Sequence, residues 1–201
     1  SILTKLGNKI ELIDGKGKTL IIGVFHGDEP QGKYLIDEYF KINNAEGLLF
    51  IPCLNPDGLQ LGKRTNANGV DLNRNFPTKN WELTEKNEFF GGMSAGSEIE
   101  TRFLIDTIDE FKPELILTLH APYKVVNYDG PAKEISEKIS QIINYPVEES
   151  IGYPTPGSFG TYAGIERQIP AITLELDEVC PVQDLVKPVF QIFDMLKKRG
   201  L

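Results

Sequence analysis

Cysteine, histidine, long apolar runs and clusters of basic residues are all scarce in this sequence of 201 residues. The two cysteines, Cys53 and Cys180, are too few for a disulfide framework or a cysteine-rich zinc site. We therefore expect a reduced, cytoplasmic compartment, or the periplasm if a secretion signal has been trimmed. No stretch reaches the roughly 18 apolar residues of a membrane span, which argues against a membrane partner. A net charge of −8 argues against a nucleic-acid partner.

Apolar runs alternate with amphipathic segments along the chain. A strand that is covered on both faces is apolar throughout, and this pattern predicts strands at residues 19–25, 47–54, 115–119 and 171–176. Apolar residues at helical spacing predict helices at residues 30–42, 97–111, 133–143 and 185–198. Asn55-Pro56-Asp57-Gly58 is interpreted as a turn that ends the second strand. The alternation favours an α/β fold, with a mixed, largely parallel central sheet and helices on both faces, in a single domain over residues 1–201.

Polar residues suited to binding and catalysis, Asn55 among them, lie at or just past the ends of the predicted strands. His26 and His120, the only histidines in the chain, each follow an apolar run, and Glu175 lies at the end of another. Ligands bind open sheets at the carboxyl ends of their strands. One histidine in such a place is more often structural, and His-x-x-Glu pairs such as His26 and Glu29 are common by chance. Two histidines with one carboxylate are nevertheless a ligand set of catalytic zinc.

Further motifs extend this pattern over residues 19–176, and together they resemble the zinc carboxypeptidase family of the pancreatic type. The matching residues are His26-x-x-Glu29, Asn55-Pro56-Asp57-Gly58, Arg64, Gly69-Val70-Asp71-Leu72-Asn73-Arg74-Asn75-Phe76, His120 and Thr173-Leu174-Glu175-Leu176. The stretch 153–160, Tyr-Pro-Thr-Pro-Gly-Ser-Phe-Gly, resembles more closely the bacterial murein peptide amidase branch, which trims cell-wall peptides. The resemblance implies a zinc carboxypeptidase-like domain, shortened relative to the digestive enzymes.

The resemblance also implies which residues would bind the metal and which would act in catalysis. The implied ligands of one zinc ion per chain are His26, Glu29 and His120. Glu175 would be the general base that accepts a proton from the attacking water. Arg64 would stabilise the negative charge that develops on the scissile carbonyl oxygen.

The remaining matches concern the substrate and the support of a metal ligand. Asn73 and Arg74 would bind the terminal carboxylate of the substrate, for which the guanidinium fork is suited. Asp71 would accept a hydrogen bond from the ring of His26. Tyr153 would close on the substrate, and Gly160 stands where digestive members select the substrate side chain.

The implied substrate is a small peptide with a free carboxyl end. Our preferred substrate is a murein tripeptide cut at its γ-D-glutamyl–diaminopimelate bond, because Gly160 leaves room for the polar far end of diaminopimelate. Loops around Asp129 and Glu166 are candidates to supply acids for its ammonium group.

Three alternatives stay open at this point. One is a general carboxypeptidase acting on α-linked peptides. The second is a zinc deacylase of the aspartoacylase type, which shares the His-x-x-Glu and Asp-Leu-Asn-Arg motifs, although Arg64, Tyr153 and the block 157–163 argue against it. The third is an inactive zinc- or peptide-binding module, against which the presence of Glu175 argues.

Overall fold

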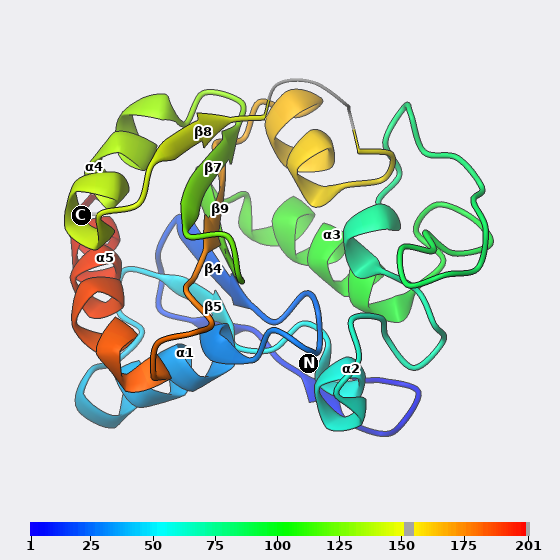
Figure 1. Ribbon diagram of the computed structural model, residues 1–201, viewed down its shortest axis with the longest axis horizontal. Coiled ribbons are helices and arrows are strands. Elements are labelled where there is room, and N and C mark those ends of the chain that lie inside the picture. Colours follow the sequence, from blue (N-terminus) through cyan, green and yellow to red (C-terminus); the bar gives the residue numbers. More distant parts are fainter. Residues whose placement is uncertain (151–154, 200–201) are drawn as a thin grey trace.

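The computed structural model describes residues 1–150 and 155–199, in which a central sheet lies between two helical layers (Figure 1). Seven strands of these residues form the sheet. Their order across the sheet is β3 (Ile13–Asp14), β5 (Leu49–Ile51), β4 (Thr19–Gly23), β6 (Leu115–His120), β9 (Ala171–Glu175), β7 (Val125–Asp129) and β8 (Val147–Glu149). Strands β5, β4, β6 and β9 are parallel, whereas β3 and β7 run antiparallel to their neighbours β5 and β9. The predicted mixed, largely parallel sheet is confirmed. A separate two-stranded sheet pairs β1 (Ile2–Leu3) with β2 (Lys9–Ile10).

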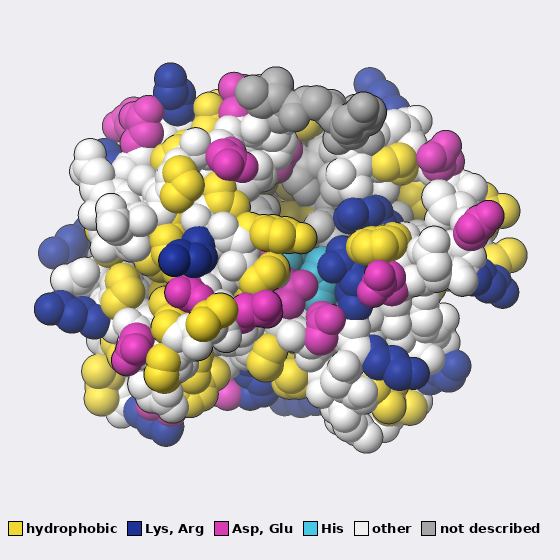
Figure 2. Space-filling view, in the orientation of Figure 1, with side chains coloured by type: hydrophobic (Ala, Val, Ile, Leu, Met, Phe, Trp, Pro, Cys, Tyr) yellow, Lys and Arg dark blue, Asp and Glu magenta, His cyan; other side chains and the backbone are white. Residues whose placement is uncertain are grey.

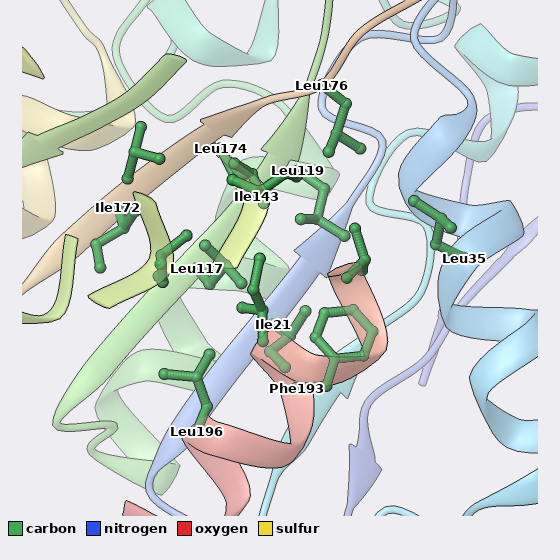
Figure 3. Packing of buried hydrophobic residues seen from close by; sticks show 14 of the residues in the cluster. Ile21, Leu35, Leu117, Leu119, Ile143, Ile172, Leu174, Leu176, Phe193 and Leu196 are labelled. Carbon is green, nitrogen blue, oxygen red and sulfur yellow. The ribbon is translucent and has the colours of Figure 1, made fainter. Parts of the chain in front are cut away.

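Two hydrophobic cores cover the two faces of the sheet, and the alternation of side chains along β4 supplies both. Ile21 packs in the cluster that includes residues of α1 (Gln31–Ile42), α4 (Lys133–Ile143) and α5 (Val186–Arg199), part of which Figure 3 shows. Leu20 and Ile22 pack on the opposite face against α3 (Ile99–Phe111) and the short π-helix η2 (Thr161–Ile165). The four predicted helices therefore agree with α1, α3, α4 and α5 to within two residues at either end.

The interpretation of Asn55-Pro56-Asp57-Gly58 as a turn was wrong, because these residues begin a short helix, α2 (Pro56–Leu61). The Asn55 side chain accepts a hydrogen bond from Gly58 N at 2.9 Å and caps the helix, and Pro56 suits its first position. Asn55 Nδ2 also donates to Phe25 O at 3.1 Å. This contact ties α2 to the segment that follows β4, just before His26.

Short 3₁₀ segments complete the described part of the chain, η1 (Leu72–Arg74) between α2 and α3, and η3 (Val182–Leu185) before α5. None of the described helices combines the length and apolar character needed to span a membrane. Cys53 and Cys180 are both free thiols.

Candidate active site

The candidate site lies where the parallel strands end. His120 is the last residue of β6, Glu175 is the last residue of β9, and the two are directly paired in the register of these strands. His26 follows the end of β4, the neighbour of β6 on its other side. Figure 2 shows histidine at the bottom of a hollow near the middle of one face, between basic and acidic side chains. The carboxyl edge of the sheet thus gathers residues from distant parts of the sequence, as expected for parallel strands.

His26, Glu29 and His120 form a buried cluster whose potential ligand atoms all lie within 4.8 Å of one another. Glu29 Oε2 lies 2.7 Å from His26 Nδ1, and Glu29 Oε1 lies 3.3 Å from His120 Nδ1. The backbone N–H of Ala121 donates to Glu29 Oε1 at 3.0 Å and helps to orient the carboxylate. Two imidazole nitrogens and one carboxylate that face a common point fit a zinc site with its fourth position open.

The cluster is strongly coupled electrostatically. Burial by itself lowers the pKa of His26, but hydrogen bonds to Asp71 and Glu29 outweigh burial and raise this pKa to about 9. Burial acts in the opposite direction on Glu29, yet the two histidines hold the pKa of its carboxyl well below the ordinary range. The carboxylate therefore stays ionised at neutral pH. A metal ion entering the site must displace the proton from His26.

Asp71 connects three of the predicted site residues. Its side chain is fully buried and accepts hydrogen bonds from His26 Nε2, Arg64 Nε and Asn73 N, each at 2.9 Å. Because His26 Nε2 is hydrogen-bonded to Asp71, Nδ1 is the ring nitrogen that faces Glu29. The Arg64 guanidinium also lies over the Phe89 ring, 4.8 Å from its centroid. Asp71 thus orients both His26 and Arg64.

A cleft of about 990 Å³ extends from the histidines along the sheet edge. Its lining includes Arg64, Asn73, Arg74, Gly160 and Glu175. Phe159 N donates to Asn73 Oδ1 at 2.9 Å, and Arg74 Nη1 donates to Asn73 O at 3.0 Å, so this pair is held against the segment that precedes η2. The metal-ligand candidates, Arg64, Asn73, Arg74, Gly160 and Glu175 all line this cleft, and Asp71 lies directly behind it. Tyr153 lies outside the described residues.

Glu175 has an unusual environment in this cleft. Its Oε2 is buried and has no hydrogen-bond partner among the described residues. Burial raises the pKa of its carboxyl, and the charge of Glu29 adds to this effect while His120 opposes it. Burial of a carboxylate oxygen without a hydrogen-bond partner costs free energy, unless a ligand or a water molecule donates the missing hydrogen bond. The oxygen is therefore placed to accept a proton from a group inside the cleft.

The family model of zinc carboxypeptidases matches residues 7–158. The chain belongs to the zinc carboxypeptidase family. Murein peptide amidase A of Escherichia coli K12 is 35% identical to it over 157 residues, covering 72% of this chain and 64% of that protein. Its counterpart in Vibrio campbellii is 34% identical over 184 residues, covering 83% and 72% of the two chains. The chain thus spans 64% of the length of the E. coli relative.

Solved structures of zinc carboxypeptidases share the fold. The murein-tripeptide amidase MpaA of Escherichia coli O157 superimposes with a TM-score of 0.86 at 28% identity, covering 97% of this chain and 89% of that one. Carboxypeptidase A of Helicoverpa armigera gives a TM-score of 0.73 at 17% identity, covering 98% and 66%, which is a likeness of fold. The resemblance inferred from the motifs is confirmed at the level of the family and its murein peptide amidase branch.

Strand β7 is one part of the site that sequence analysis missed. Val125, Asn127 and Asp129 line the cleft, whereas Val126 and Tyr128 face the core under α4. This alternation within Val-Val-Asn-Tyr-Asp is typical of a half-buried strand and was the signal that could have located it. Of the two acids expected near the substrate ammonium, Asp129 lies in the cleft. Glu166 instead accepts a hydrogen bond from Lys79 N at 2.8 Å and is absent from the cleft lining in the described part of the chain.

Proposed function

We propose that this chain is a zinc-dependent peptidase that hydrolyses the peptide bond before a C-terminal residue with a free carboxylate. Murein peptides are the proposed substrate class, and the γ-D-glutamyl–diaminopimelate bond is the proposed point of cleavage. One observation carries the proposal: the His26, Glu29 and His120 cluster and the unpaired oxygen of Glu175 share a single cleft with Arg64 and Arg74. The murein peptide amidase names of the relatives support the choice of substrate.

The metal would be held by His26 Nδ1, His120 Nδ1 and the Glu29 carboxylate, one ion per chain. Zinc in such a site is a Lewis acid that lowers the pKa of water toward about 7 and polarises a carbonyl. Asp71 keeps the His26 ring in the tautomer and orientation that presents Nδ1, through the hydrogen bond at Nε2.

Glu175 would accept the proton of the attacking water and pass it to the nitrogen of the leaving residue. Its raised pKa suits both steps, because a base whose pKa lies closer to neutrality also returns the proton more readily. Arg64 would stabilise the negative charge on the carbonyl oxygen during attack. Its bond to Asp71 and its stacking on Phe89 fix the guanidinium before the substrate arrives.

Arg74 and Asn73 would recognise the terminal carboxylate. The planar guanidinium of Arg74 can donate two parallel hydrogen bonds to a carboxylate, and the amide of Asn73 can donate a third. The contacts of Asn73 with Phe159 and with Arg74 hold both groups in place. This pair would restrict the enzyme to the last residue of a chain, which is the behaviour of an exopeptidase.

The test is hydrolysis by the zinc-loaded protein of three compounds at equal concentration, with products identified by mass. They are L-Ala-γ-D-Glu-diaminopimelate, the α-linked peptide Ala-Ala-Lys and an N-acetyl amino acid. We expect release of diaminopimelate to have the highest kcat/KM. Faster cleavage of Ala-Ala-Lys would replace the murein assignment with a general carboxypeptidase, and faster cleavage of the N-acetyl compound would favour a deacylase. The His120→Ala variant is the control, and its activity and high-affinity zinc binding should be lost together.

A further inference from the structure

A second cavity, of about 760 Å³, adjoins the cleft, and Asp28 and Arg64 line both of them. Arg64 O accepts a hydrogen bond from Gly27 N at 3.4 Å, which ties this arginine to the segment between His26 and Glu29. The cavity therefore begins beside the proposed metal ligands. Much of its lining comes from the long segment between η1 and α3, on the side of the molecule away from α5 in Figure 1. The proposed chemistry leaves the rest of this cavity without a role.

A bound substrate extends in two directions from the bond that is cut. The groups proposed to bind the leaving residue, Asn73 and Arg74, line the cleft and are absent from the described lining of the second cavity. The acyl part of the substrate, which is bonded to the scissile carbonyl carbon, has to continue from Arg64 in another direction. Because Arg64 lines both spaces, the second cavity is open to the acyl part.

Consecutive aromatic residues contribute one ring to each space. Phe89 lines the cleft, and the Arg64 guanidinium lies 4.8 Å from the centroid of its ring. Phe90 lines the second cavity, and the Lys86 ammonium lies 5.9 Å from the centroid of its ring. Phe90 O also accepts a hydrogen bond from Asp71 N at 2.8 Å. The wall that carries Lys86 is thus attached to the carboxylate-bearing residue that orients Arg64.

Two exposed lysines give the second cavity positive charge that no carboxylate in the described part of the chain neutralises. Lys63 and Lys86 line the cavity, and neither ammonium lies within ion-pair distance of a described carboxylate. Glu98, a buried acid of the lining, instead accepts hydrogen bonds from Asn66 Nδ2 and Asn68 Nδ2, both at 2.9 Å. The two ammonium groups are therefore available to an anion that enters the cavity.

A γ-linked glutamate brings such an anion with its acyl part. Its side-chain carboxyl forms the scissile bond, so its α-carboxylate stays free, four bonds from the scissile carbonyl carbon. An α-linked residue has its carboxyl group in the scissile bond and keeps no such carboxylate. Asp28 and Glu88 also line the cavity, so its charges are of both signs, as are those of an L-alanyl-γ-D-glutamyl group with a free ammonium. Complementary charges of this kind contribute to specificity more than to affinity.

We propose that the second cavity binds the acyl part of the substrate and that Lys63 and Lys86 recognise the α-carboxylate of its γ-linked glutamate. This inference rests on the proposed function, because it assigns a new binding site to the same substrate class. A lysine ammonium is a compact charge with three donors on a flexible stem, which suits a carboxylate in an open cavity. Selection of the γ-linkage then comes from the acyl side and is independent of the leaving residue.

The test compares two tripeptides that differ only in this carboxylate. One is L-Ala-γ-D-Glu-diaminopimelate, and the other contains D-isoglutamine, in which a carboxamide replaces the α-carboxylate. Both release diaminopimelate, so a difference between them reports on the acyl side. The parent should cut the glutamyl peptide with a kcat/KM about 5- to 10-fold higher, between the effects of an exposed ion pair and of a hydrogen bond to a charged group.

The double variant Lys63→Met, Lys86→Met should bring this ratio to within about twofold of unity. The loss should appear in KM for the glutamyl peptide, with kcat almost unchanged, because the α-carboxylate takes no part in the bond that breaks. The double variant Lys187→Met, Lys198→Met is the matched control, since it removes the same charge from exposed positions of α5, and it should keep the parental ratio.

Circular dichroism and zinc content would establish that each variant is folded and loaded. Equal kcat/KM for the two peptides in the parent would overturn the inference and leave the proposed function standing. A parental ratio in Lys63→Met, Lys86→Met would do the same, because the discrimination would then come from other groups. If the parent cuts neither peptide, the proposed function fails, and the inference fails with it.

Discussion

Replacing Asp71 with asparagine would test how far the site depends on one buried carboxylate. Asp71 Oδ1 accepts from His26 Nε2 and Asn73 N, and Oδ2 accepts from Arg64 Nε. Asparagine preserves the shape but has only one oxygen. If this oxygen stays with His26 and Asn73, the new amide group faces the N–H of Arg64, and one charged hydrogen bond is lost.

The expected magnitudes follow from these contacts. A hydrogen bond to a charged group contributes about 1.5–3 kcal/mol. Because 22% of the Arg64 side chain is exposed and can be rehydrated, we expect the free energy of unfolding to fall by an amount near the lower figure, about 1.5 kcal/mol. The removal of a carboxylate that supports a metal-bound histidine typically weakens metal binding about 10- to 100-fold, which corresponds to about 1.4–2.8 kcal/mol. Activity should fall further, because Arg64 loses its fixed orientation.

The assay is a competition titration of zinc against a chromophoric chelator, combined with urea unfolding. Asp57→Asn is a matched control, because Asp57 is also fully buried. Its carboxylate accepts hydrogen bonds from Thr4 Oγ1, Leu6 N and Asn8 Nδ2, and none of these groups belongs to the proposed metal site. Both variants should lose stability, but only Asp71→Asn should lose zinc affinity. A zinc dissociation constant within twofold of the parent value in Asp71→Asn would refute the supporting role of this carboxylate.

Three further predictions concern the remaining groups of the cleft. Glu175→Gln should keep zinc and stability but lose about 10²- to 10⁴-fold in kcat; near-parental turnover in the metal-loaded variant would show that another group is the base. Arg74→Ala should lower kcat/KM about 10- to 100-fold for a free-acid substrate, with little change for its C-terminal amide, and equal losses for both would contradict carboxylate recognition. The pKa of His26 rises from 6.5 to about 9 in the metal-free fold, so apparent zinc affinity should increase about tenfold per pH unit from pH 7 toward pH 9. The protonated His26 also stabilises the metal-free fold. This contribution to the free energy of unfolding is complete below about pH 6.5 and is lost as the pH rises through about 9. Calorimetry in two buffers of different ionisation enthalpy should detect the released proton, and its absence at pH 7.5 would contradict the raised pKa.

Much of the fold was predictable because the central strands are buried on both faces. In β4 and β6 every residue is buried, and such continuous apolar runs are conspicuous in a sequence. The positions of His26 and His120 followed from the ends of these runs, and that of Glu175 from the end of the apolar run in β9. The roles assigned to these residues stay predictions, whereas their proximity is a feature of the structure.

Strand β7 and helix α2 escaped prediction for different physical reasons. Strand β7 is buried on one face and lines the cleft with the other, so its polar residues interrupt the continuous apolar run that is typical of a strand covered on both faces. Helix α2 begins with asparagine followed by proline, and both residues favour turns as well as helix starts. The position of Asp129 beneath Gly160 depends on the tertiary packing of β7 against η2, which no local pattern of residues encodes.

The separation of the proposed metal ligands along the chain has a kinetic consequence. Glu29 and His120 are brought together only after β4 and β6 have paired in parallel, and the connection between these strands includes α1, β5, α2 and α3. A fragment made early in synthesis, such as residues 1–60, therefore contains His26 and Glu29 but lacks His120. Metal that binds only after the sheet has formed cannot accelerate the rate-limiting step of folding, but it must be released or distorted before β4 and β6 separate. Zinc should consequently lengthen the lifetime of the folded protein while leaving its refolding rate almost unchanged.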